Sequence, residues 1–300
     1  MPPWSAMATL PSFSARRLAI CGALLILSTG TGAAALPKSA KRAAVARATP
    51  NLPADVLERL QSGDSASIQS ALDDVRVAGR DGATAAPVIA ALLRQGMPLS
   101  LTRAAIDTLA DTESDAASDV LSWYSRHRDA GVRRSAVQAL AHTGGPEAVP
   151  AVRIALADSD PDVRGAAATA LGALNARDAV ADLFRALDRN VKEAGASLGQ
   201  LCAPSDCERL VDKLGQMPFE VVTSGIERML VRPVTEVGDD LKLRIIARVT
   251  ELGTAGANGF LRGVQKRWPK RGSPIVRQAL DEAVRATSAS PGSRHRGGTR

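Results

Sequence analysis

A period of 31 residues runs through the middle of this chain and limits the folds that it can adopt. In the stretch ADSDPDVRGAAATALGALNARDAVADLFRAL, residues 157–187, residues 160–187 match residues 129–156 when they are moved back by 31 positions. The matching pairs are Asp129 with Asp160, Val132 with Val163, Arg133 with Arg164, Leu140 with Leu171, Val149 with Val180, Val152 with Leu183 and Leu156 with Leu187. A second shift brings residues 101–112, LTRAAIDTLADT, into the same pattern. A fixed period of this length is typical of repeat proteins, whose units bury their apolar faces by stacking on one another.

The composition of one unit predicts two helices. Asp160 suits the N-cap, Pro161 suits the first helical position, and Asp162 adds a negative charge at the positive end of the helix dipole. Apolar residues then recur at three- and four-residue spacing in two stripes. The stripes are Val163, Ala167, Ala170, Leu171 and Leu174, and then Val180, Leu183, Phe184 and Leu187. Since no segment alternates as a strand does, the sequence predicts an all-α protein: an α-α superhelix of about seven helical pairs over residues 53–286.

Residues 144–174, GGPEAVPAVRIALADSDPDVRGAAATALGAL, resemble the short HEAT-like repeats of the phycobilisome lyase type. Those units run Pro-Glu-Ala-Val-Pro-x-Leu, then Asp-x-Asp-Pro-x-Val-Arg, and then an Ala-rich helix that ends in Leu-Gly. The resemblance is close over residues 129–189 and can be traced over 64–286, although the spacing becomes irregular after residue 189. It implies a helical solenoid whose second helices line the concave face and meet a partner there.

The two ends of the chain differ in composition from the repeats. Arg16 and Arg17 precede the apolar run LAICGALLIL, and three alanines end at Ala35, which is the order of a secretory signal peptide. We therefore expect a signal over residues 1–35, cleavage after Ala35, and export to the periplasm or the extracellular space. The apolar run is too short to cross a bilayer, so we expect membrane contact only if the signal stays on as an anchor. Residues 36–52 are predicted to be a basic flexible linker, and residues 287–300 a disordered basic tail.

The positive charge of the chain belongs to its ends. The formal net charge is +7, and two of the arginines lie in the predicted signal. The linker and the tail hold no acidic residue and contain Lys38, Lys41, Arg42, Arg47, Arg294, Arg296 and Arg300. Because nucleic-acid binding needs a basic stripe on the folded surface, we do not expect a nucleic-acid partner.

The sequence offers no pattern of catalytic residues. Its three histidines have no metal-binding spacing, and there is no Gly-x-Ser-x-Gly turn, phosphate-binding glycine loop or cysteine cluster. We therefore predict no catalytic, cofactor or metal site, and a non-enzymatic scaffold or binding module of the bacterial cell envelope with a protein partner. Two alternatives stay open. A chromophore-lyase-like enzyme is implied only by the resemblance, and a regulator of an envelope enzyme cannot be separated from a scaffold by sequence.

Four residues are the candidates for partner binding. Trp123 and Tyr124 are adjacent aromatics in a chain with only 3% aromatic residues, and they fall on the second helix of their unit. Arg153 and Arg185 fall on the second helices of the next two units. By the resemblance, outward-facing residues of these helices meet the partner. The alternative is that Tyr124 packs in the core and that both arginines are solvated surface charges.

Cys202 and Cys207 are the only cysteines outside the predicted signal. Aligning LGQLCAPSDCERL with LGALNARDAVADL places Cys202 at the end of a first helix and Cys207 in the first turn of a second helix. Two antiparallel helices with so short a joint bring such α-carbons to roughly 5–6 Å, within reach of a disulfide. An even pair of cysteines in an oxidising compartment favours the bond. The alternative is a buried Cys207 and a free thiol at Cys202.

Overall fold

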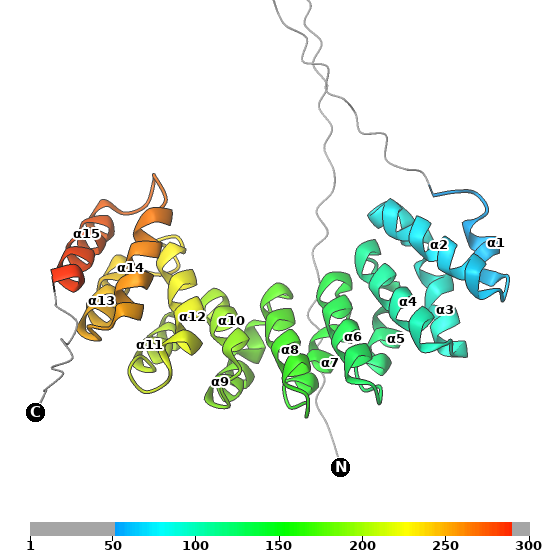
Figure 1. Cartoon of the computed structure of the whole chain (residues 1–300), viewed down its shortest axis with the longest axis horizontal. Helices are drawn as coiled ribbons and strands as arrows, with labels where there is room; N and C mark the ends of the chain where they lie inside the picture. The colour runs from blue at the N-terminus through cyan, green and yellow to red at the C-terminus, as the bar shows by residue number, and fades with distance from the viewer. Residues whose placement is uncertain (1–51, 290–300) are drawn as a thin grey trace, which may run out of the picture. The chain divides into compact units, whose positions relative to one another are not determined.

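The computed structural model describes residues 52–289, which form α-helices stacked pair upon pair in one row (Figure 1). The helices are α1 Val56–Gln61, α2 Ser65–Ala78, α3 Ala86–Gln95, α4 Leu99–Thr112, α5 Ser118–Tyr124, α6 Ala130–Thr143, α7 Ala148–Ala155, α8 Pro161–Ala173, α9 Val180–Asp188, α10 Lys192–Leu201, α11 Pro204–Asp212, α12 Phe219–Val231, α13 Asp239–Glu251, α14 Ala255–Arg267 and α15 Pro274–Ala289. Short 3-10 turns at Gly79–Ala85, Asp115–Ala117 and Arg177–Ala179 lead into α3, α5 and α9. After α1, the pairs run from α2/α3 to α14/α15, and residues 52–289 contain no β-strand. The predicted all-α superhelix of seven pairs is confirmed.

Aspartates start the regular helices as the repeat pattern predicts. Asp129 accepts the backbone N–H of Val132 at 3.0 Å, and Asp160 accepts those of Asp162 and Val163 at 2.8 and 3.2 Å. Each cap satisfies backbone donors that have no partner within the helix. These positions are equivalent in consecutive units, so the same cap fixes where each first helix begins.

Both residues of the Val-Arg pair that follows each cap have a structural role: the valine packs in the core and the arginine holds a loop. Val132 and Val163 are fully buried in the core. Arg133 donates through Nη1 to the carbonyl oxygens of His127 and Arg128, at 3.0 and 3.1 Å. Arg164 makes the same contacts one unit later, with two carbonyls at 2.8 and 2.9 Å. The arginine therefore holds the loop that leads into its own helix.

The first helices of successive pairs, α4, α6, α8, α10 and α12, pack directly on one another. Glycines allow the closest approach, between α10 and α12: a Cβ atom added at Gly199 would lie 2.1 Å from the carbonyl oxygen of Gly225. A Cβ atom at Gly225 would lie 2.3 Å from the carbonyl oxygen of Gly195. Only the absence of a side chain at these positions lets the two backbones meet.

The C-terminal boundary differs from the prediction. The solenoid was expected to end at residue 286, but α15 continues through Ala289. The side chain of Thr287 explains part of the extension, because its hydroxyl donates to the carbonyl of Ala283 at 2.8 Å and accepts from the amide of Asn258 at 2.6 Å. Ser288 donates to the carbonyl of Val284 at 2.6 Å. The predicted signal peptide, the linker up to residue 51 and residues 290–300 lie outside the described residues.

Candidate functional site

An open groove of about 790 Å³ lies over the first helices of the described stack. It crosses α4, α6 and α8 and is bounded by α2 and α10. The resemblance implies that second helices line the concave face, and that expectation is wrong. The first helices α4, α6, α8 and α10 pack directly on one another, whereas the second helices α3, α5 and α7 contact one another less, so this part of the stack is hollowed on the side of the first helices.

The groove is built from equivalent positions of consecutive units. Asp107, Gln138 and Thr169 are spaced by 31 residues, and all three line it. The positions four residues further on form a second row: Asp111, His142 and Ala173. The spacing of four residues places both rows on the same side of their helices. The groove therefore presents two rows of side chains that vary from unit to unit on a constant framework.

Carboxylates outnumber cations in this groove. Its acidic residues are Asp107, Asp111, Asp162 and Glu193, and its arginines are Arg76 and Arg134. The side chain of Arg134 lies 3.6 Å from Asp162, and Arg76 is engaged by Asp73 at 3.1 Å. Within residues 52–289, neither Asp107 nor Asp111 has an ion-pair partner.

Burial and repulsion both act on the carboxylate of Asp107. Its pKa is raised above the ordinary value of 3.8, chiefly because burial penalises the charged form, and the negative charge of Asp111 adds to the effect. The pKa is lowered in turn by a hydrogen bond with Ser135 and by the positive charges of Arg76 and Arg103, but these effects do not cancel the rise. A cation placed in the groove would relieve both costs.

The floor of the groove consists of small side chains. Alanines and glycine from α6 and α8 form it: Ala139, Gly165, Ala166 and Ala170. Glu193 of α10 closes one end, with its carboxylate against Gly165, where an added Cβ atom would lie 3.0 Å from it. A floor of this kind lets the backbone of another chain come close.

The predicted aromatic pair divides into one exposed and one buried ring. The side chain of Trp123 is 66% exposed, whereas that of Tyr124 is only 4% exposed and its hydroxyl donates to the carbonyl of Leu93 at 2.8 Å. Tyr124 is therefore a packing residue, and its assignment to partner binding is wrong. Trp123 stands edge-on to it, with ring centroids 4.9 Å apart, beside the ion pair of Arg94 with Asp119.

The two predicted arginines share a carboxylate. Arg153 of α7 lies 2.7 Å from Asp182 and 3.6 Å from Asp178, and Arg185 of α9 also pairs with Asp182. Their charges are thus compensated within the chain. Trp123, Arg153 and Arg185 all lie on second helices and none of them lines the groove, so the structure does not bring the predicted residues together with it.

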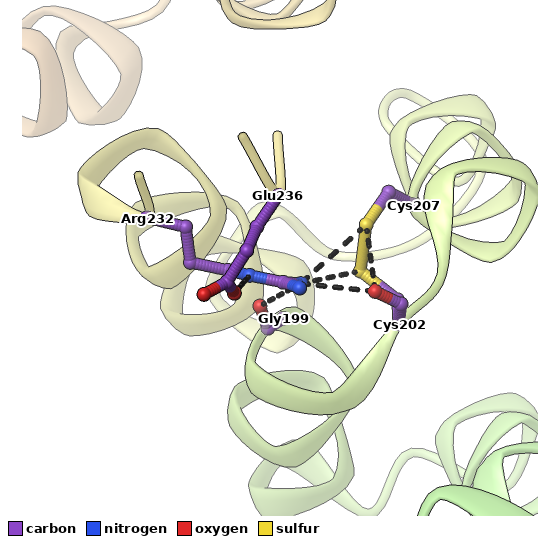
Figure 2. Close-up of a disulfide and its surroundings, with 5 residues drawn as sticks. All are labelled: Gly199, Cys202, Cys207, Arg232 and Glu236. Carbon is purple, nitrogen blue, oxygen red and sulfur yellow. Dashed lines mark hydrogen bonds and ion pairs between the residues drawn. A yellow bond between two sulfur atoms is a disulfide. The ribbon is translucent and has the colours of Figure 1, made fainter. Parts of the chain in front are cut away.

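Figure 2 shows the disulfide between Cys202 and Cys207, which links the end of α10 to the first turn of α11. The two α-carbons are 5.2 Å apart and both residues are buried. Arg232, which follows α12, donates through Nη1 to the carbonyl oxygens of Cys202 and Gly199 at 3.0 and 3.3 Å (Figure 2). Glu236 holds the same guanidinium at 3.0 Å. The loop between α12 and α13 is thereby fastened to the disulfide, a role of Arg232 that the sequence did not suggest.

The groove residues were missed although the sequence holds a signal for them. They occupy repeat positions at which the residue type changes between units, next to positions that match.

In the part of the chain that the structure describes, no group of histidines, cysteines and carboxylates could hold a metal ion. Within the same range, every helix is too short or too polar to traverse a bilayer.

Comparison with known proteins places the central repeats in a family. The family model for HEAT repeats matches residues 85–160 and 151–230. No curated protein matches the sequence.

Several solved structures are similar to this chain. One is the complex of CpcE and CpcF of phycocyanin lyase from Nostoc sp. PCC7120, with 18% identity over 86% of this chain and 100% of that one, and a TM-score of 0.41. Another is a designed armadillo repeat protein in complex with the peptide (KR)4, with 17% identity over 80% of this chain and 99% of that one, and a TM-score of 0.40. An engineered protein matches at 17% identity over 78% of this chain and 67% of that one, with a TM-score of 0.44. At these scores the similarity carries no inference about what the chain binds.

Proposed function

We propose that this chain, whose residues 85–160 and 151–230 match the family model for HEAT repeats, is a non-enzymatic binding module, or scaffold, that holds a protein partner in the groove over α4, α6 and α8. The single observation that carries the proposal is the pair of carboxylates without ion-pair partners, Asp107 and Asp111, above a floor of alanine and glycine. Side chains that vary on a regular framework give a repeat protein its specificity, and stacked repeats provide extended surfaces for this purpose.

The partner proposed for this groove is a protein segment with exposed basic side chains. Lysines or arginines of such a segment would pair with Asp107, Asp111 and Glu193, and charge pairs of this kind give specificity and fast association. The small floor residues would let its backbone approach. Because the groove is open to solvent, salt screens these charge pairs, and binding of this kind weakens as salt is added.

We also propose that the chain works outside the cytoplasm, in the periplasm or the extracellular space. Two features support this: the signal-like order of the first 35 residues, and the disulfide between the only two cysteines that would remain after cleavage. The test is cell fractionation followed by mass spectrometry of the N-terminus. A mature chain that begins at Leu36 in the exported fraction would support the proposal, and a full-length chain in the cytoplasm would contradict it.

The binding proposal is tested by neutralising the groove. A triple variant, Asp107→Asn, Asp111→Asn and Glu193→Gln, removes three negative charges from it. The matched control, Glu58→Gln, Glu220→Gln and Asp240→Asn, removes three exposed charges elsewhere. Both are compared with the parent chain in chemical cross-linking to an envelope extract, with the bound proteins identified by mass spectrometry.

A partner that is lost with the groove variant and kept with the control would support the groove. Equal capture by both variants would place the binding surface elsewhere. The same experiment separates the alternatives, because a bound pigment or turnover would indicate a lyase-like enzyme. A captured enzyme whose activity changes in the complex would indicate a regulator.

A further inference from the structure

A second cavity, of about 470 Å³, lies near the C-terminal end of the described residues. Two loops enclose it: residues 232–238, between α12 and α13, and residues 268–273, between α14 and α15. Its volume is in the range of sites for small ligands. It shares no lining residue with the groove over the first helices.

Two polar side chains of this cavity have a buried atom without a hydrogen-bond partner. One is Nε1 of Trp268, whose side chain is only 8% exposed, and the other is Oδ1 of Asp239. The other oxygen of Asp239 accepts from the hydroxyl of Ser273 at 2.6 Å, which fixes the carboxylate in place. Buried donors and acceptors are almost always paired in folded proteins, so an unpaired donor and an unpaired acceptor in one cavity indicate a ligand that supplies both partners.

Lys242 adds a buried cation to the same cavity. The residue is only 4% exposed, and its Nζ donates to the carbonyl of Arg232. No carboxylate within residues 52–289 lies within ion-pair distance of it. The pKa of Lys242 is lowered, chiefly by burial and also by the positive charge of Arg232. The negative charge of Asp239 acts in the opposite direction without cancelling the effect. An ammonium has three N–H donors, so Lys242 can still donate to an anion.

The charges around the cavity favour a ligand with a single negative charge. Arg232 contributes its backbone here, because its guanidinium is turned toward the disulfide and paired with Glu236 (Figure 2). The remaining charges are those of Lys242, Arg271 and Asp239, with one cation in excess.

Apolar side chains line the rest of the cavity. Val231 and Val234 are 46% and 58% exposed, and they are among the few large apolar residues of the described chain at the surface. Prolines extend this wall: Pro233, Pro269 and Pro274. An apolar group of the ligand would cover it.

We propose that this cavity binds the C-terminal carboxylate of an extended apolar peptide, such as the last residues of a protein partner. The carboxylate accepts from Nζ of Lys242 and Nε1 of Trp268. The amide N–H of the terminal residue donates to Oδ1 of Asp239, and its side chain covers Val231 and Val234. A free amino acid fits less well, because its ammonium cancels the negative charge that the cavity favours.

The proposal is tested by isothermal titration of the full mature chain with N-acetyl-Ala-Val-Leu, as the free acid and as the C-terminal amide. The free acid should bind and the amide should bind at least about tenfold more weakly, since it loses the charge-assisted hydrogen bonds. N-acetyl-leucine, which has the carboxylate but no preceding residues, should also bind more weakly than the tripeptide. Equal affinity for acid and amide, or for N-acetyl-leucine and the tripeptide, would overturn the assignment.

Two variants separate binding from folding. Trp268→Phe removes a donor that is unpaired in the free protein, so it should leave the melting temperature unchanged or slightly raised while weakening the peptide about threefold to tenfold. Lys242→Met keeps the bulk of the side chain and should weaken the peptide by at least about tenfold. Trp123→Phe, on an exposed ring outside the cavity, is the control and should not change the affinity. If Trp268→Phe and Lys242→Met bind the free acid as the parent does, the proposal is wrong.

Discussion

The ion pair of Arg133 with Asp158 joins two consecutive units through side chains that are 14% and 11% exposed. Two hydrogen bonds link them, from Nε at 2.8 Å and from Nη2 at 2.7 Å. Burial acts to raise the pKa of Asp158, but hydrogen bonds from Arg133 and from the backbone N–H of Asp160, with the charge of Arg133, outweigh it and hold the pKa below its ordinary value of 3.8. The folded state therefore favours the charged form of this carboxyl.

This depressed pKa gives a prediction about acid. A group whose pKa is lower in the folded state stabilises the fold fully above its unfolded-state pKa, and the contribution is lost as pH falls below about 3.8 toward the folded-state value. Asp158→Asn should lower the free energy of unfolding by about 2 kcal/mol at pH 7 and by less at pH 3. Urea unfolding at pH 7, 5 and 3 measures this, with the exposed Asp212→Asn as a control that should have little effect. A difference between parent and Asp158→Asn that stays constant with pH would contradict the argument.

The disulfide gives a prediction about thiols. If the chain is exported and cleaved after Ala35 as proposed, it should show, when denatured without reductant, no thiol that reacts with iodoacetamide, because Cys202 and Cys207 are bonded to each other. After reduction it should show two. Replacing both cysteines with serine should lower the free energy of unfolding by about 2 kcal/mol, since the bond closes only a short loop of the unfolded chain. Two reactive thiols in the unreduced chain would exclude the bond.

Most single-residue roles inside the repeat could be predicted from the sequence. The caps at Asp129 and Asp160 and the buried Leu140 and Leu171 follow from spacing alone. Residue type alone could not show which of the two rings, Trp123 or Tyr124, is buried, but helix geometry explains why only one of them is. Adjacent residues are about 100° apart around a helix, so when one ring packs inward its neighbour faces away.

At the level of helices, the contact between α10 and α12 depends on glycine. Gly199 sits within α10, where alanine is normally the better helix former by about 1 kcal/mol. Gly199→Ala should nevertheless destabilise the chain by about 1–3 kcal/mol, because its Cβ would meet the backbone of Gly225 at 2.1 Å. Thermal unfolding of Gly199→Ala and of Gly259→Ala compares the two effects directly.

Gly259 is the matched control because it lies in α14, with no atom within 4 Å of an added Cβ. There the helix propensity acts alone, so Gly259→Ala should be neutral or slightly stabilising. If both variants changed the melting temperature in the same direction, close approach of α10 and α12 would not be what requires glycine at 199.

The helix order could be predicted, but the side that is hollowed could not. The 31-residue period fixes which helix follows which, and the apolar stripes fix which faces turn inward. The bend of the stack depends instead on the difference in spacing between first and second helices. The first helices approach closely through glycine contacts such as Gly172 with Ser197 and Gly199 with Gly225, which only the packed structure shows.

For the molecule as a whole, stability should depend on position along the row of helices. Each unit of a repeat protein contacts only its neighbours, so its stability is close to a sum over units and the interfaces between them. The exposed face of α4, α6 and α8, where the groove lies, is thus supported by units on both sides. The C-terminal pair α14/α15 has a neighbour on one side only within residues 52–289.

This difference gives a paired prediction. Leu171 of α8 and Leu280 of α15 are both fully buried, so replacing either with aspartate places an unpaired charge in the core at a cost of several kcal/mol. Leu280→Asp should unfold α14 and α15 locally and leave the amide protons of α4, α6 and α8 protected from hydrogen exchange. Leu171→Asp should remove that protection on both sides of α8, because it breaks the row in its middle. Hydrogen exchange with mass spectrometry resolves the two patterns. The groove should keep its binding in Leu280→Asp and lose it in Leu171→Asp.

If both substitutions removed protection across the whole chain equally, the units would fold as a single cooperative block, and the additive picture of stacked repeats would not hold for this protein.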